Sequence, residues 1–233
     1  MDIKSQLLNE YPFKLELHLH TKPVSRCASV SPEDAIEIYH KHGFDAVTLT
    51  NHIDPCALSF SEDDWLEHYM KGYNELCEAA KKYGMTVYLA AEVRFTENAN
   101  DYLVYGVDEE VIRNIHRHLD KGIAEFYASV DKEKTIVLQA HPFRDNMERN
   151  YTEHLDGIEV FNMAAHNARP GDAVMFAKEH PGIKVGGKDL HYPSNIPSIK
   201  TRFKKAPKDC LELAKMLKLG DYIFELGDMV VLP

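Results

Sequence analysis

Short runs of β-branched and apolar residues alternate along the chain with longer amphipathic stretches, and this alternation constrains the fold more than any other feature. Alternating strands and helices favour an α/β protein with a parallel sheet, and seven strands in about 200 residues favour a barrel over an open sheet. We therefore expect residues 1–233 to form a single domain, a seven-stranded (β/α)7 TIM-like barrel. The runs with the length and composition of strands are residues 14–17, 46–50, 86–91, 102–106, 135–140, 157–161 and 183–186.

The stretches between these runs carry signals that are typical of helix ends. Ser31 is a good N-cap for one helix, and Gly43 follows the end of that helix. Asp63 or Asp64 begins a longer helix that runs to Gly84. Further helices are expected at residues 110–127, 172–179 and 208–217.

Composition and charge exclude several classes of protein. Hydrophobic residues make up 44% of the 233 residues, which indicates a full core, and no apolar run approaches the ~18 residues of a membrane span. The four cysteines form no CxxC pair and no secretory signal precedes them, so we expect reduced thiols in a cytoplasmic protein. A net charge of −10 argues against nucleic acid as the main partner.

Histidines and carboxylates follow directly after most of the predicted strands. The carboxyl ends of parallel barrel strands meet at one face, so these side chains, although far apart in sequence, would share one cleft. Buried charge at that density needs cations, and mixed nitrogen and oxygen ligands suit Zn²⁺, Mn²⁺ or Fe²⁺ better than Mg²⁺ or Ca²⁺. The side chains are His18, His20, His52, Glu92, His141, Asp189 and His191.

The spacing of two pairs within this set indicates chelation of a metal. His18 and His20 are separated by one residue at a strand end, so both imidazoles point to the same side. Asp189 and His191 repeat this spacing with a carboxylate in place of one imidazole.

These residues stand in motifs that resemble those of the polymerase and histidinol phosphatase (PHP) family. The motifs are HLHT at 18–21, LTNH at 49–52, AE at 91–92, AHP at 140–142 and GKDLH at 187–191, and their order and spacing match over roughly residues 14–195. The resemblance implies a distorted seven-stranded barrel, two or three divalent metal ions at the strand ends, and phosphoester hydrolysis. We expect a hydroxide that bridges two ions to attack phosphorus in line.

The resemblance also implies a ligand set for each ion. Carried over position by position, the first ion would be held by His18, His20, Glu92 and Asp189, the second by His141 and a bridging Glu92, and the third by His52 and His191.

The chain departs from the family pattern in three places. Many members have an aspartate or histidine a few residues after the HxH pair, where this chain has Cys27, which is either a ligand or a free thiol. Asn51 replaces the usual aspartate before His52. After the fourth strand there is no histidine, only Asp101 and Asp108, so two occupied metal positions are as consistent with the sequence as three.

Arginines near the strand ends are natural partners for phosphoryl oxygens, because a guanidinium binds such oxygens bidentately. Arg144 and Arg169 are the first choices, with Arg94 and Arg26 after them. His166, which follows the sixth strand, is expected to contact the substrate or to donate a proton to the leaving group.

Glu92 is counted with the catalytic residues because it would bridge two ions. Glu159 and Asn162 are expected to orient the metal ligands from behind.

Three functions fit this pattern. The first is a phosphoesterase acting on a small phosphomonoester, with histidinol phosphate or a nucleotide as candidate substrates. The second keeps the metal ions but cleaves an amide or a different ester, because a metal-activated hydroxide also attacks those bonds. The third is a metal-stabilised binding or regulatory module that has lost catalysis through the changes at Cys27 and near Asp108.

Overall fold

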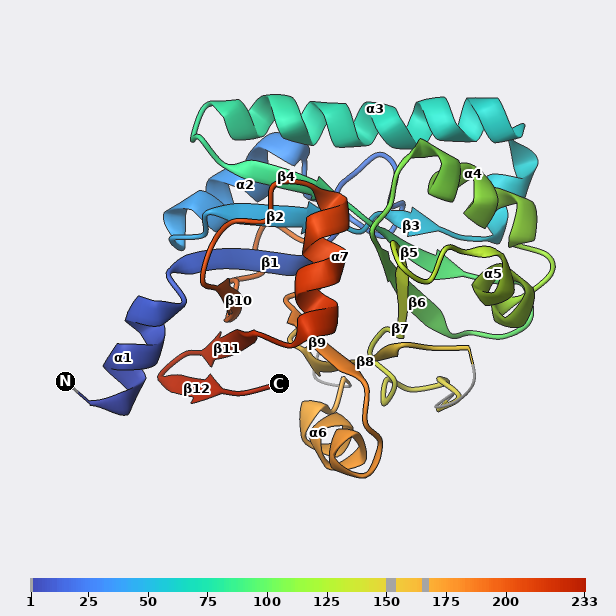
Figure 1. Cartoon of the computed structure of the whole chain (residues 1–233). Helices are drawn as coiled ribbons and strands as arrows, with labels where there is room; N and C mark the ends of the chain where they lie inside the picture. Colours follow the sequence, from blue (N-terminus) through green and yellow to red (C-terminus); the bar gives the residue numbers. More distant parts are fainter. Residues whose placement is uncertain (1, 150–153, 165–167) are drawn as a thin grey trace.

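The computed structural model describes residues 2–149, 154–164 and 168–233, in which helices surround two β-sheets (Figure 1). The helices are α1 (Ile3–Glu10), α2 (Pro32–Lys41), α3 (Glu62–Lys81), α4 (Glu109–His118), α5 (Ile123–Ser129), α6 (Pro170–Glu179) and α7 (Cys210–Leu219), with a 3-10 turn at Pro55–Ser59. The strands are β1 (Phe13–Leu19), β2 (Ala46–Leu49), β3 (His52–Ile53), β4 (Thr86–Leu89), β5 (Ala91–Arg94), β6 (Asp101–Tyr105), β7 (Ile136–Gln139), β8 (Gly157–Asn162), β9 (Ile183–Gly187), β10 (Ile199–Phe203), β11 (Tyr222–Leu226) and β12 (Met229–Val231).

Each run that was predicted to be a strand contains one, but the run at 86–91 covers β4 and the first residue of β5, which lie in different sheets. The strands do not form a single parallel barrel. One sheet has the order β12-β11-β10-β1-β2-β4 and the other β3-β5-β6-β7-β8-β9. Both sheets are mixed, because β10, β11 and β12 pair antiparallel in the first and β6 runs antiparallel to β5 and β7 in the second. In the described part of the chain the pairing closes no barrel, so the expected closed seven-stranded barrel is not confirmed.

The direction of β6 follows from the length of the connection before it. Only residues 95–100 separate β5 from β6. A parallel pair needs a crossover of about a dozen residues or more, whereas a connection this short returns the chain antiparallel. The amino end of β6 therefore lies at the same end of the sheet as the carboxyl ends of its neighbours, β5 and β7.

The two sheets are joined by chain segments that pass from one to the other. β2 and β3 are separated only by Thr50 and Asn51, and β4 and β5 only by Ala90. A parallel bridge between Leu19 and Leu190 also brings the end of β1 beside the segment that follows β9. The ends of strands from both sheets thus meet in one place.

The structure confirms one helix start that was expected from the sequence. It corrects another start and divides one expected helix into two. Ser31 caps α2 as expected, and its hydroxyl accepts a hydrogen bond from the Asp34 N–H. The expectation that α3 begins at Asp63 or Asp64 is wrong, because Ser61 is the cap. The expected helix at 110–127 is two helices, α4 and α5, since Gly122 between them has a φ of +94° that breaks the helix.

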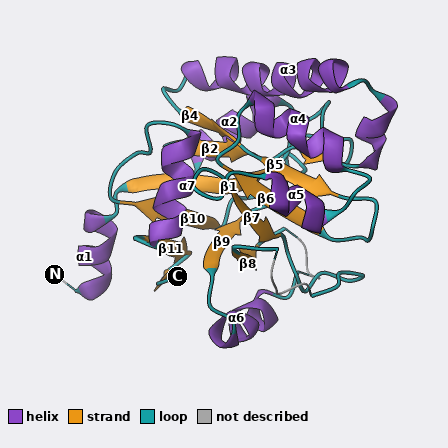
Figure 2. Cartoon of the chain, turned by 45° about the vertical axis from the view of Figure 1, so that its right-hand side comes forward, coloured by secondary structure: helices purple, strands orange, loops and turns teal. Residues whose placement is uncertain are grey.

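The helices cover the outer faces of the sheets. The long helix α3 lies along one side and packs against α2 and α4, while α6 packs on β8 at the opposite side (Figure 2). Within the described residues, no helix is both long and apolar enough to cross a membrane.

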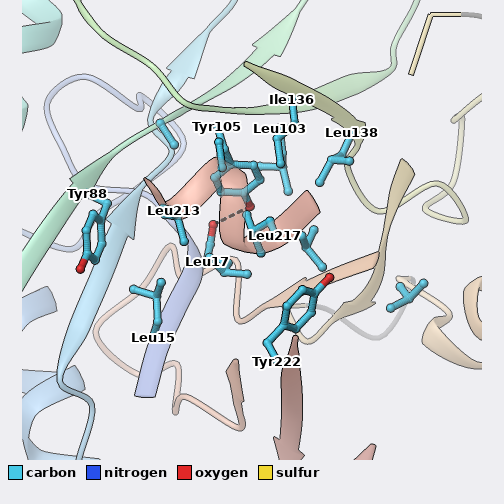
Figure 3. Close-up of a cluster of buried hydrophobic side chains, with 14 of the residues drawn as sticks. Leu15, Leu17, Tyr88, Leu103, Tyr105, Ile136, Leu138, Leu213, Leu217 and Tyr222 are labelled. Atoms are coloured by element: carbon cyan, nitrogen blue, oxygen red, sulfur yellow. Dashed lines mark hydrogen bonds between the residues drawn. The ribbon is translucent and has the colours of Figure 1, made fainter. Parts of the chain in front are cut away.

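One buried cluster of apolar side chains lies directly behind the strand ends (Figure 3). It includes Leu15 and Leu17 of β1, and the Tyr105 hydroxyl donates a hydrogen bond to the Leu17 carbonyl at 2.9 Å. This packing and hydrogen bond position the part of β1 that directly precedes His18.

Candidate metal centre

The ends of β1 and β9 and the middle of β5 bring four ligand-type atoms together. The Nε2 atoms of His18 and His20 lie 3.0 Å apart, and both side chains are fully buried. Asp189 Oδ1 lies 3.5 Å from the His18 Nε2 and 3.1 Å from the His20 Nε2. Glu92 Oε2 lies 3.3 Å and 3.1 Å from the same two nitrogens.

These distances fit a divalent cation at the centre of the four atoms. Tetrahedral bonds of 2.0–2.1 Å to nitrogen and oxygen place the ligand atoms about 3.3 Å apart. The buried Asp189 Oδ1 accepts no hydrogen bond from the residues that the structure describes. A buried carboxylate oxygen without a donor is costly, and a cation would remove that cost.

Glu92 also reaches a second group of ligand-type atoms. Its Oε1 lies 2.9 Å from the His141 Nε2, which in turn lies 3.8 Å from Asp101 Oδ2. All three side chains are buried. Glu92 is thus placed between two potential metal positions, one on each of its oxygens.

Asp101 was not among the expected ligands, although Asp101 and Asp108 were both considered. The expectation used the carboxyl end of the fourth strand, but β6 is antiparallel, so its first residue, Asp101, faces the centre. Asp108 instead caps α4 by accepting a hydrogen bond from the Val111 N–H. The short connection at 95–100 is the sequence signal that identifies the correct aspartate.

A third group lies towards the surface. The ring centroids of His52 and His191 are 4.4 Å and 4.5 Å from that of His20, and suitable nitrogens of these three residues could share an ion. Cys27 lines the same cavity as His52 and His191. Burial raises the pKa of Cys27, but the nearby imidazoles of His191 and His52 together outweigh burial and lower the pKa to about 6.

The electrostatics of the centre keep its carboxylates charged. Burial alone would raise the pKa of Glu92 and of Asp189, but the nearby imidazoles, His18 above all, lower both well below their usual range. Burial alone would lower the pKa of His18, yet Asp189, Glu159 and Glu92 together raise it well above its usual value. The same carboxylates that favour a proton on His18 also favour a metal ion, so protonation of His18 and metal binding compete.

Glu159 connects several ligands from behind. Its Oε1 lies 2.8 Å from the His18 Nδ1, and its Oε2 accepts hydrogen bonds from the His141 N–H and the Asn162 side chain, both at 2.9 Å. The Asn162 amide also donates to Asp189 Oδ2 at 3.1 Å. Glu159 and Asn162 are thus in position to orient ligands from β1, β7 and β9, as expected.

We expect Glu159→Gln to lower metal affinity about 10–100-fold, because a partner that orients a ligand histidine contributes on that scale. Titration of the chelated protein with Zn²⁺ measures the effect. Glu179→Gln, at an exposed position on α6, is the matched control and should bind Zn²⁺ as the unmodified chain does. Equal affinities for both variants would contradict this role of Glu159.

Two further features of the centre were missed from the sequence. Glu16 Oε1 accepts hydrogen bonds from the backbone N–H groups of His18 at 2.9 Å and Lys188 at 2.8 Å, and so ties β1 to β9. A Cβ atom at Gly187 would lie 2.4 Å from the His18 Cβ, so only glycine permits this approach. No local pattern distinguishes this glutamate or glycine from others in the chain.

Two of the candidate ligands have a strained backbone. His141 has a φ of +29° and Asp189 a φ of +54°, in the region that side chains other than glycine rarely adopt. Such conformations cost about 1–3 kcal/mol and cluster at functional sites. Their occurrence at two candidate ligands supports a functional role for this centre.

A cavity of about 460 Å³ opens beside the centre. Arg94 and Arg144 both lie on it and both bond to Asp101, with Nε and Nη2 of Arg94 at 2.7 and 2.6 Å and Nη2 of Arg144 at 2.6 Å. Its lining consists of Arg26, Cys27, His52, Asp54, Arg94, Arg144 and His191.

Of the remaining two candidates, the structure describes only Arg169. Arg169 is not part of the cavity lining and instead pairs with Asp145 and the Phe143 carbonyl. His166 lies outside the described residues, so its expected role stays a prediction.

Comparison with known proteins agrees with this geometry. The model of the PHP domain family matches residues 16–228, most of the chain. The chain therefore belongs to the PHP domain family. A comparison with curated proteins found no match.

Several solved structures share the fold at low sequence identity. A two-domain protein from Bacteroides vulgatus, described as containing a predicted PHP-like metal-dependent phosphoesterase, has a TM-score of 0.66 at 16% identity, over 94% of this chain and 66% of its own. PsfC from Pseudomonas syringae has a TM-score of 0.62 at 15% identity, over 93% and 92%. The lesion-specific endonuclease PfuEndoQ from Pyrococcus furiosus has a TM-score of 0.58 at 16% identity, over 90% and 57%.

Proposed function

We propose that this chain is a metal-dependent phosphoesterase that hydrolyses a small phosphomonoester. The observation that carries the proposal is the pair of buried Nε2 atoms of His18 and His20, 3.0 Å apart, with carboxylate oxygens of Glu92 and Asp189 within 3.1–3.5 Å of them, beside a cavity lined by three arginines. The PHP family assignment supports a metal-dependent hydrolase, and the arginines favour phosphate over a neutral amide or ester. The expectation that nucleic acid is not a partner stays a prediction.

The ligand assignment is part of this proposal. Bound Zn²⁺, Mn²⁺ or Fe²⁺ would lower the pKa of a water molecule and neutralise charge on the phosphoryl group. We assign the first position to His18, His20, Glu92 and Asp189, the second to Glu92, Asp101 and His141, and the third to His52, His191 and Cys27.

The protein's own groups orient the substrate. Arg94 and Arg144 line the cavity and have N–H groups that Asp101 does not use, which are available to bind phosphoryl oxygens. Asp101 holds both guanidinium groups in fixed positions, so little side-chain entropy is lost when phosphate binds.

Turnover of p-nitrophenyl phosphate tests the proposal. Chelated protein should release little p-nitrophenol, and reconstitution with Mn²⁺ or Zn²⁺ should restore turnover. His141→Ala should abolish this metal-dependent turnover because it removes a ligand of the second position. Protein that binds metal but stays inert towards this ester would contradict a phosphoesterase and favour a binding module, whereas turnover of p-nitroacetanilide alone would favour an amide hydrolase.

The reactivity of Cys27 tests the third position separately. In chelated protein at pH 7, iodoacetamide should alkylate Cys27 faster than Cys77, because the first thiol has a pKa of about 6 and burial raises the pKa of the second. The rate at Cys27 should fall as the pH drops below about 6, where the thiolate is protonated.

Zn²⁺ added before the reagent should protect Cys27 and leave the rate at Cys77 unchanged. Mass spectrometry of the alkylated peptides measures both rates. Undiminished alkylation of Cys27 in zinc-loaded protein would exclude it as a ligand.

A further inference from the structure

Positive charge is concentrated at the cavity of an otherwise acidic chain. The chain has 27 lysines and arginines against 37 aspartates and glutamates, yet three guanidinium groups line this one cavity. Among the lining residues that the structure describes, Asp54 is the one carboxylate; its Oδ1 accepts a hydrogen bond from the Cys56 N–H, and its Oδ2 lies 3.7 Å from Arg26 Nη2. The cavity therefore suits a ligand with more than one negative charge.

Two of the three guanidinium groups bond to Asp101, a proposed ligand of the second metal position. Arg94 and Arg144 both bond to Asp101, which is buried and lies 3.8 Å from the His141 Nε2. A phosphoryl group bound at that position would lie next to both arginines. Together with the metal ions they supply enough positive charge for its oxygens.

Arg26 is placed differently. Among the described residues it contacts no carboxylate of the metal centre; its Nη2 donates to the Cys56 thiol and lies 3.7 Å from Asp54 Oδ2. Its side chain is 67% exposed at the cavity wall. Both of these contacts, to the Cys56 thiol and to Asp54, involve Nη2, so the other N–H groups of Arg26 can bind an anion.

We propose, as an extension of the proposed function and resting on it, that the substrate carries a second anionic group, which Arg26 binds. The scissile phosphoryl group lies at Arg94 and Arg144, and a carboxylate or second phosphate lies at Arg26. A volume of about 460 Å³ accommodates a small molecule with two such groups. Histidinol phosphate, with a cationic amine in place of the second anion, fits this cavity poorly.

Binding of non-hydrolysable phosphonates to the metal-loaded protein tests the inference without turnover. Propylphosphonate, 3-aminopropylphosphonate, 3-phosphonopropanoate and propane-1,3-bisphosphonate share one chain length and differ in the second group. We expect calorimetry to show that one or both anionic compounds bind about 10-fold or more tighter than propylphosphonate, since charge-assisted hydrogen bonds are the strong ones. The affinities of 3-phosphonopropanoate and propane-1,3-bisphosphonate, compared with each other, show whether a carboxylate or a second phosphonate is preferred. The aminopropyl compound should bind weakest.

Arg26→Gln should remove most of the advantage of the anionic compounds while lowering affinity for propylphosphonate much less. Arg117→Gln is the matched control, since Arg117 pairs with Glu62 and Glu110 on the surface and should not affect any compound. Equal affinities across the series, or an equal loss for all compounds in Arg26→Gln, would overturn the inference. Absence of phosphate release from the matching phosphate esters would instead contradict the proposed function alone.

Discussion

Glu92→Gln is expected to reduce metal-dependent phosphate release by about 1,000-fold or more, well beyond the 10–100-fold loss typical of an outer partner of a ligand. Glu92 lies between two potential metal positions, with Oε1 2.9 Å from the His141 Nε2 and Oε2 within 3.3 Å of His18 and His20. Glutamine has one oxygen and no charge, so it cannot serve both positions.

Steady-state turnover of p-nitrophenyl phosphate and metal content per chain measure the effect together. Glu110→Gln, at an exposed position of α4, is the control and should change neither. If Glu92→Gln kept both its metal and its turnover, the bridging role assigned to Glu92 would be wrong.

Asp101→Asn is expected to lower the metal content by one ion per chain and to reduce turnover about 100-fold or more, because a ligand is lost outright rather than an outer partner. The amide also cannot hold Arg94 and Arg144 as the carboxylate does at 2.6 Å. Thermal unfolding shows whether the variant remains folded.

Asp108→Asn provides a sharp control, because Asp108 follows β6 at the opposite end from Asp101. Asp108 caps α4, and asparagine caps helices about as well as aspartate, so metal content, turnover and stability should be nearly unchanged. A larger loss at Asp108 than at Asp101 would contradict the placement of β6.

The ligands at strand ends could be predicted from the sequence because a short pattern fixes both the strand and the direction of the side chain. His18 and His20 are the clearest case, since a one-residue spacing places both imidazoles on one side of β1. His141 and Asp189 directly follow strands that were recognised from their apolar runs, and the structure places both beside Glu92 and His18.

Strand direction and long-range pairing could not be predicted as well. The antiparallel β6 exchanges the roles of Asp101 and Asp108. The strands β10, β11 and β12 were not expected, and β10 pairs antiparallel with β1 at the other end of the chain. The hydrogen bond from the Lys188 N–H to Glu16 joins residues 172 positions apart, and no local sequence pattern reveals it.

Arginine positions were only partly predictable. Arg144 lies in the cavity as expected, and Arg94, a second choice, lies there too. Arg169 is outside the lining because it pairs with Asp145 instead. Long side chains near a strand end can turn towards the cavity or away from it, and only the surrounding partners decide between the two.

The most direct test of the account is elemental analysis of the protein purified without chelator and again after reconstitution with Mn²⁺ and Zn²⁺. We predict two or three divalent ions per chain, bound by the centre around Glu92 and reduced in number in Asp101→Asn. A chain that holds no ion, or only one, even after reconstitution would contradict the proposed metal centre.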